Sequence, residues 1–242
     1  MPLKKDIKLV RSLQQKKFRN EHGLFLVEGK KMVEEALTSS FRLHSLYTTD
    51  EGFSDERAIK VNNKEMEMMT ALSSPSSYLA VLYKKENKLT EVLDLKGTVL
   101  VLDGIADPGN MGTILRTAEW FGIVHVFCTD DCVELYNPKT VQSTMGSLFR
   151  TTVVEAEAGE IVALLKSNDY RLTGADMNGT SLYDFTFLPK EAIVIGSESH
   201  GIRTQMREAM DAYITIPGSG KAESLNASIA TSIILSEVFR RK

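Results

Sequence analysis

Polar side chains recur beside glycines at three separated points in the second half of the chain. They are Asn110 and Arg116 in the first segment, Glu198 in the second, and Ser224 with Asn226 in the third. Each segment borders an apolar run, where the strands of an α/β sheet end and ligands bind. A hydrophobic core does not need an arginine, a carboxylate and small polar groups there. A site that binds and orients a polar ligand does.

Each of these residues also has a structural explanation. Asn110 precedes a helical pattern at 111–121 and is a candidate N-cap, and Ser224 is a candidate cap for the pattern at 224–240. Arg116 lies off the apolar stripe of its helix, where an arginine is often simply solvated. No single segment is diagnostic, so the functional hypothesis depends on the ordered set of three.

Familiar catalytic and nucleotide-binding motifs match the chain incompletely. The hydrolase pattern G-x-S-x-G around Ser199 has Ser197 in place of its first glycine, and no suitable Asp and His follow in order. A phosphate-binding loop ending at Lys221 would need glycine at 215 and Ser or Thr at 222. No G-x-G-x-x-G follows the first strand of this half, which disfavours a dinucleotide site. A Ser199 hydrolase stays open as a minor alternative.

The elements that must position these residues alternate between strands and helices. Apolar runs predict parallel strands at 98–103, 124–128, 152–154, 170–175, 192–195 and 212–216. Helical patterns lie at 111–121, 138–147, 160–167, 201–210 and 224–240. This alternation predicts an α/β layer with helices on both faces and a site at the carboxyl ends of the strands.

The first part of the chain predicts a smaller α/β unit. Strands are expected at 23–29, 43–48 and 78–83, with helices at 7–18, 30–37 and 64–72. The polar run 84–91 is a plausible linker. We therefore expect two domains, at 1–90 and 97–242.

Charge and composition restrict the function classes. The 242 residues have a formal net charge of −3, yet the first 31 contain 9 basic and 3 acidic side chains. Such an arm indicates an anionic polymer as partner, although a solvated helix face explains it as well. Cys128 and Cys132 match no usual zinc or redox spacing, and no apolar run reaches the length of a membrane span. We expect a cytoplasmic protein without a metal or a disulfide.

The ordered motifs resemble those of the SpoU (TrmH-like) group of SPOUT RNA 2′-O-methyltransferases. The resemblance covers about residues 97–240 and is carried by Asn110, Gly112, Arg116 and Ala118, then Gly196, Glu198, Gly201 and Ile202, then Ile216, Pro217, Gly220, Ser224, Leu225, Asn226 and Ser228. Ser197 and Ser199 depart from the more usual Asn and Gly. The segment from Lys16 to Gly29 resembles the members that act on ribosomal RNA, which have an N-terminal RNA-binding domain.

The resemblance implies a fold, a cofactor and roles for the residues. It implies a parallel-sheet domain with a trefoil knot, S-adenosyl-L-methionine bound in the knot, no metal, and a homodimer through the knotted domain. The catalytic residues that it implies are Arg116, Asn110, Glu198, Ser224 and Asn226. The implied cofactor contacts are Ala175, Gly196, Gly201, Ile216 and Leu225. The implied RNA contacts are Lys16, Lys17 and Arg19. Ribosomal RNA is the favoured substrate. The alternatives are transfer RNA, or a non-catalytic RNA-binding factor on the same fold. The modified nucleotide, and whether Arg116 is a base or an electrostatic stabiliser, stay open.

Overall fold

A parallel sheet of six strands, in the order β10-β8-β9-β5-β6-β7, forms the centre of the second half of the chain. The computed structural model describes residues 4–92 and 94–240. The strands are β5 (Val99–Asp103), β6 (His125–Thr129), β7 (Thr152–Ala156), β8 (Arg171–Ser181), β9 (Glu191–Gly196) and β10 (Ala212–Thr215). All five pairings are parallel, so every strand ends at the same edge. The predicted α/β fold with a parallel sheet is confirmed, and the trefoil knot stays a prediction.

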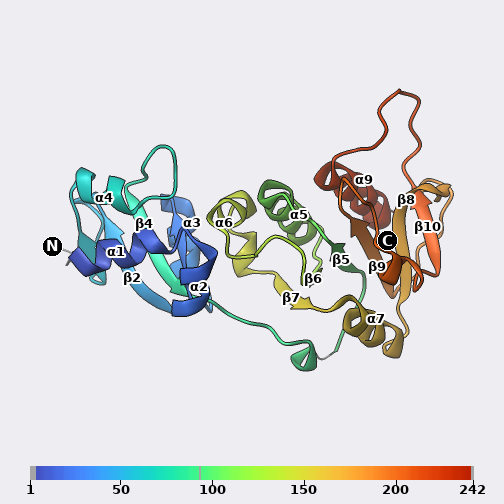
Figure 1. Cartoon of the computed structure of the whole chain (residues 1–242), viewed down its shortest axis with the longest axis horizontal. Coiled ribbons are helices and arrows are strands. Elements are labelled where there is room, and N and C mark those ends of the chain that lie inside the picture. Colours follow the sequence, from blue (N-terminus) through green and yellow to red (C-terminus); the bar gives the residue numbers. More distant parts are fainter. Residues whose placement is uncertain (1–3, 93, 241–242) are drawn as a thin grey trace. The chain divides into compact units, whose positions relative to one another are not determined.

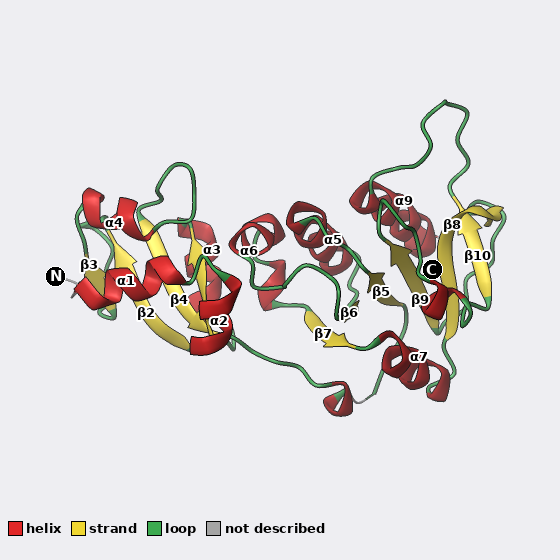
Figure 2. Cartoon of the chain, viewed as in Figure 1, coloured by secondary structure: helices red, strands yellow, loops and turns green. Residues whose placement is uncertain are grey.

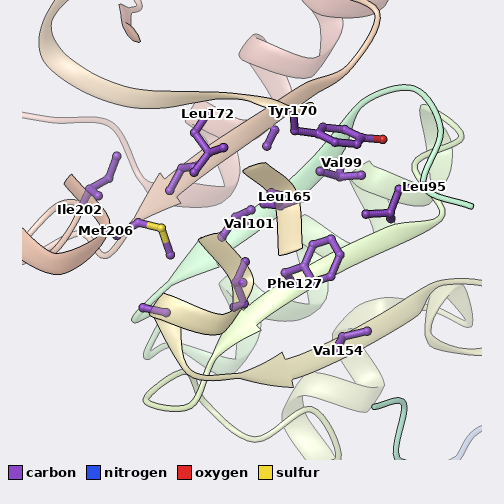
Figure 3. Close-up of a cluster of buried hydrophobic side chains, with 14 residues drawn as sticks. Leu95, Val99, Val101, Phe127, Val154, Leu165, Tyr170, Leu172, Ile202 and Met206 are labelled. Carbon is purple, nitrogen blue, oxygen red and sulfur yellow. The ribbon is translucent and has the colours of Figure 1, made fainter. Parts of the chain in front are cut away.

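Helices cover both faces of this sheet, which explains its continuous apolar strands. Figure 1 shows α5 (Pro108–Trp120) and α9 (Ala227–Arg240) along one face and α7 (Ala158–Ser167) along the other. Because side chains alternate along a strand, Val99 and Val101 point to the α7 face and Leu100 and Leu102 to the opposite one. Figure 3 shows the α7-side cluster, in which Val101 and Phe127 pack with Leu165, Leu172 and Met206.

A second, smaller sheet has the order β1-β4-β2-β3. Its elements are α1 (Lys4–Ser12), α2 (Lys16–His22), β1 (Leu24–Glu28), α3 (Lys30–Thr38), β2 (Leu43–Thr48), β3 (Ala58–Lys60), α4 (Asn63–Met69) and β4 (Tyr78–Tyr83). β4 pairs antiparallel with β1 and β2, and β2 pairs parallel with β3 (Figure 2). Leu79 and Val81 of β4 pack with Val10 and Leu13 on one side of this sheet.

The chain divides into two compact units. The first contains the residues up to Lys85 together with Glu134–Phe149, and the second contains Glu86–Val133 and the residues from Arg150 onward. The segment Glu134–Phe149 holds α6 (Pro138–Thr144) and a short 3₁₀ helix, η2 (Ser147–Phe149). Nothing in the sequence indicated that this segment groups with the first unit. The domain boundaries at 1–90 and 97–242 stay a prediction.

Several predicted elements are shorter than expected. The helix expected at 7–18 is two helices, because the chain turns at 13–15 before α2 begins. The helix expected at 201–210 is only α8 (Thr204–Arg207), and the predicted linker contains a 3₁₀ turn, η1 (Leu89–Glu91). The strand β3 was not predicted, since three half-exposed residues leave no periodic signal. Among the described residues, no helix is long and apolar enough to cross a membrane.

Candidate functional site

Three polar side chains from the three motifs meet in one hydrogen-bonded chain. Asn110 Nδ2 donates to Glu198 Oε1, although the two residues are 88 positions apart. Asn226 Nδ2 donates to Asn110 Oδ1 at 2.9 Å, across 116 positions. The order Glu198–Asn110–Asn226 fixes the orientation of the Asn110 amide, because only its nitrogen can donate to the carboxylate. The structure thus brings together three of the five predicted catalytic residues.

Asn110 is free to make these contacts because another residue caps its helix. Asp107 is the N-cap of α5, and its Oδ1 accepts from the Asn110 backbone N–H at 2.9 Å. Pro108 occupies the first helical position, where its missing N–H costs nothing. The alternative interpretation of Asn110 as the N-cap is therefore wrong, since the helix begins two residues before Asn110, earlier than its apolar pattern indicated.

The cap of α9 is Asn226 and not Ser224. Asn226 Oδ1 accepts from the backbone N–H groups of Ser228 at 3.0 Å and Ile229 at 3.3 Å, and from Ser228 Oγ at 2.6 Å. The helix begins at Ala227, so the predicted start at 224 was wrong. Asn226 therefore uses its oxygen for the helix and its nitrogen for Asn110.

Glu198 lies on a tight turn that follows β9. Ser197 and Gly201 pair with each other through two backbone hydrogen bonds, of 3.1 and 2.9 Å. A Cβ at Gly196 would lie 2.2 Å from the backbone carbon of Gly201, so only glycine fits there. Gly201 has φ +65°, the left-handed region that favours glycine. The two motif glycines thus make the turn possible.

A cavity of about 270 Å³ opens beside this network. All five predicted cofactor contacts line it, and so do Glu198 and Ser224. The predicted residues are Ala175, Gly196, Gly201, Ile216 and Leu225. The wall also includes apolar side chains that the motifs did not indicate, namely Met177, Ile195, Ile214, Ala230 and Ile234. Apolar side chains and exposed backbone fit a flat heterocycle such as adenine.

Asp176 adds a negative charge to the cavity wall, and the motifs did not identify it. Burial opposes its ionisation, but hydrogen bonds from the Asn178 backbone N–H and from Arg207 outweigh burial, so the pKa of Asp176 lies below its ordinary value. Arg207 Nη2 lies 2.6 Å from Asp176 Oδ2. Asp176 therefore presents an ionised carboxylate, paired with Arg207, at the cavity wall. In the sequence, the only signal for Asp176 was its position directly after Ala175, a predicted cofactor contact.

Arg116 lies apart from this network. It is exposed, and within the described residues it has no hydrogen-bond or ion-pair partner. It follows Asn110 by six residues, about 9 Å along the helix axis. Within the described residues of one copy, Arg116 makes no hydrogen bond or ion pair with Glu198 or Asn226.

The alternative nucleophile Ser199 does not form a triad. Its Oγ lies 2.8 Å from His200 Nδ1, and both residues are exposed. Among residues 4–92 and 94–240, no carboxylate hydrogen-bonds to the His200 ring. The turn also pairs with itself and does not run directly into a helix. These features disfavour the hydrolase alternative.

Of the three predicted RNA contacts, Lys16 and Lys17 are exposed, but Arg19 is not. Arg19 is only 2% exposed and donates from Nε and Nη2 to the two carboxylate oxygens of Glu134, at 3.2 and 2.5 Å. Its assignment as an RNA contact is therefore wrong. A glutamate 115 positions away leaves no local signal of such a pairing.

The first unit also has a cationic aromatic cluster that the sequence did not single out. The Arg42 guanidinium lies 3.6 Å from the centroid of the Tyr83 ring, and the His44 ring lies 5.6 Å from the same centroid. Arg42 and His44 are exposed. Guanidinium planes and aromatic rings are the surfaces on which unpaired RNA bases stack.

Comparison with known proteins covers both units. Residues 97–236 match a family model described as the SpoU rRNA methylase family, and residues 4–80 match one described as an MRM3-like substrate binding domain. The chain is 31% identical over 232 residues to a 23S rRNA (guanosine(2553)-2′-O)-methyltransferase from Bacillus subtilis, covering 93% of this chain and 92% of the relative.

Solved structures match this chain over 98% to 100% of its length. A TrmH-family structure from Porphyromonas gingivalis is 33% identical, with a TM-score of 0.88 and full coverage of both chains. An rRNA methyltransferase from Sinorhizobium meliloti, solved with AdoMet bound, is 25% identical, with a TM-score of 0.89 over 98% of this chain and 95% of that one.

Proposed function

This chain belongs to the SpoU rRNA methylase family, and we propose that its substrate is ribosomal RNA and that the Glu198–Asn110–Asn226 network positions the reacting ribose. The chain is an S-adenosylmethionine-dependent RNA methyltransferase that acts on a ribose 2′-hydroxyl. The observation that supports the site assignment is the meeting of all three motifs beside one cavity. Neither a hydrophobic core nor a set of helix caps would require the three motifs to meet there.

The residues of the cavity fit S-adenosylmethionine. The missing side chain at Gly196 lets the Gly201 backbone pack against it, which shapes the turn at the cavity wall, and apolar side chains surround the space. The adenine would lie against Ile216 and Leu225. When bound, this cofactor would supply an activated methyl group, so the residues of the site must align the ribose hydroxyl with it. The hydroxyl proton would pass to solvent water.

Arg116 stabilises the oxygen that receives the methyl group. A ribose hydroxyl is a poor nucleophile and develops negative charge as its proton leaves. An arginine stays protonated, so we assign Arg116 to stabilising this charge or the adjacent phosphate and not to acting as a base. Ser224, at the cavity wall, holds the ribose. Asn226, whose amide is already engaged, holds Asn110 in place.

We further propose that two copies of the chain combine to complete the site. Trp120 is 82% exposed and lies four residues after Arg116, so both are on one face of α5. Ile229 of the neighbouring helix α9 is 52% exposed. A homodimer packed through these helices would bury both side chains and remove their apolar surface from water. Arg116 would then face the second copy.

The dimer is tested with Trp120→Glu. We expect the variant to sediment as a monomer, to keep its fold and to lose methyl transfer. A Glu67→Gln variant, at an exposed position of α4, serves as the control. A wild-type protein that sediments as a monomer at micromolar concentration and is fully active would refute the dimer.

The activity is tested by mapping 2′-O-methyl groups in total RNA from cells with and without this protein. We expect one ribosomal RNA position to lose its methyl group, and to regain it in vitro with the wild type but not with Arg116→Ala. Loss of a transfer RNA methyl group alone would contradict the ribosomal assignment. No change in any RNA, with no binding of S-adenosylmethionine in calorimetry, would favour the non-catalytic alternative.

A further inference from the structure

A buried aspartate outside the three motifs accepts hydrogen bonds from both the backbone and the side chain of one arginine. Asp103 ends β5 and its side chain is fully buried. Its Oδ2 accepts from the Arg203 backbone N–H at 2.7 Å, and its Oδ1 accepts from Arg203 Nε at 2.7 Å and lies 2.6 Å from Nη2. Burial opposes the charge of Arg203, but these bonds outweigh it and raise its pKa above the ordinary value.

This pair closes the turn that carries Glu198. The turn starts at Gly196, which is the pairing partner of Asp103 in the parallel sheet. It ends at Arg203, which Asp103 holds through the ion pair. Both ends of the turn are therefore attached to the same residue of β5. Asp131, after β6, lies 2.7 Å from Arg203 Nη1 and restrains the arginine from a third strand end.

Asp103 also starts the segment that delivers Asn110. Gly104 follows it with φ +70°, and the buried Ile105 leads to Asp107, the cap of α5. One residue thus anchors both partners of the hydrogen bond between Asn110 and Glu198. A change in the Asp103–Arg203 pair would therefore displace Glu198 relative to Asn110, while β5 and β9 would stay paired.

We propose that Asp103 and Arg203 are positioning residues that set the contact between Glu198 and Asn110. The proposal rests on the proposed function of that network. It predicts that the geometry of this ion pair, and not only its charge, controls the rate of methyl transfer. A lysine at 203 keeps the charge but cannot provide the planar fork that engages a carboxylate through two nitrogens.

The test compares Arg203→Lys with a matched variant elsewhere in the same sheet. Arg171 and Glu191 form a similar pair, with the glutamate fully buried and Nη2 to Oε2 2.7 Å, but they start β8 and β9 at the amino edge. We expect Arg203→Lys and Arg171→Lys to lower the melting temperature by similar amounts. Only Arg203→Lys should lower kcat at saturating RNA and S-adenosylmethionine, on the order of 10- to 100-fold, because small misplacements of reacting groups cost that much.

Asp103→Asn provides a second test if Arg203→Lys folds poorly. The side-chain oxygen of the new amide still accepts from the Arg203 backbone, but the ion pair is lost, and kcat should again fall while KM for RNA stays within about 3-fold. Equal kcat for the Arg203 and Arg171 variants would overturn the proposal. So would a loss of activity explained by unfolding alone. Failure of the wild type to methylate RNA would instead reject the proposed function.

Discussion

Asn226 joins two elements with the two ends of one amide: its nitrogen donates to Asn110 at 2.9 Å, and its oxygen caps α9 through the backbone of Ser228 at 3.0 Å. The position of Asn110 is therefore tied to the first turn of the last helix. This double use separates the structural contribution of Asn226 from its contribution to the site, because different atoms make the two sets of contacts.

Asn226→Asp should keep the cap of α9 and lose the hydrogen bond to Asn110. A carboxylate oxygen still accepts from Ser228 and Ile229, so the free energy of unfolding should change by less than about 0.5 kcal/mol. Neither oxygen can donate to Asn110, so kcat should fall on the order of 10-fold or more. Asn226→Ala should lose both, with about 1 kcal/mol of stability. Urea unfolding and methyl-transfer assays measure the two effects. Equal stability of both variants would contradict the capping role.

Gly196→Ala should weaken cofactor binding strongly. The new Cβ would lie 2.2 Å from the backbone carbon of Gly201, so the turn must shift, and with it the cavity wall that both residues line. We expect calorimetry to show an affinity for S-adenosylmethionine weakened on the order of 100-fold or more, with a lowered melting temperature. Gly218→Ala is the matched control, since a Cβ there meets no atom within 4 Å. Normal cofactor affinity in Gly196→Ala would show that the turn is not part of the binding site.

The basic residues of the N-terminal arm should separate into two classes. Neutralising Lys16 and Lys17, which are exposed, should weaken RNA binding and make its dependence on salt less steep, by about 1.4 to 1.8 in the log–log slope for two phosphate contacts. Stability should stay nearly unchanged. Arg19→Met should instead cost about 3 kcal/mol of folding free energy, because it leaves Glu134 buried with Lys84, at 3.7 Å, as its one remaining cationic partner among the described residues. Filter binding at several salt concentrations and urea unfolding distinguish the classes.

Glu28 should make the stability of the chain depend on pH. Burial raises its pKa above the ordinary value of 4.5, against hydrogen bonds from Thr70 and Ala71. The folded state therefore holds this proton more tightly than the unfolded state. Its contribution to stability is complete below pH 4.5 and is lost as the pH rises through the folded pKa. Relative to Glu28→Gln, the wild type should thus lose stability as pH increases from 4.5. A difference between the two proteins that is independent of pH would contradict this.

The sequence alone determined the fold class and which three segments matter. Apolar runs such as Val99–Asp103 and Glu191–Gly196 predicted the buried parallel strands, because covering both faces of a sheet requires continuous apolar residues. Glycines beside polar residues marked the strand ends. The predicted cofactor contacts all line one cavity for the same reason: they lie on loops that a parallel sheet brings to one edge.

Only the tertiary structure decided what the individual polar side chains do. Asn110 was a candidate cap and is a bridge, Asn226 is the cap, and Arg19 is buried against Glu134. Asp103 and Arg203, which no motif indicated, hold the turn together. Hydrophobic periodicity is a local property that a sequence displays directly. A hydrogen bond or ion pair joins residues 88 to 116 positions apart, and its partner is chosen only when the folded chain brings the two side chains together.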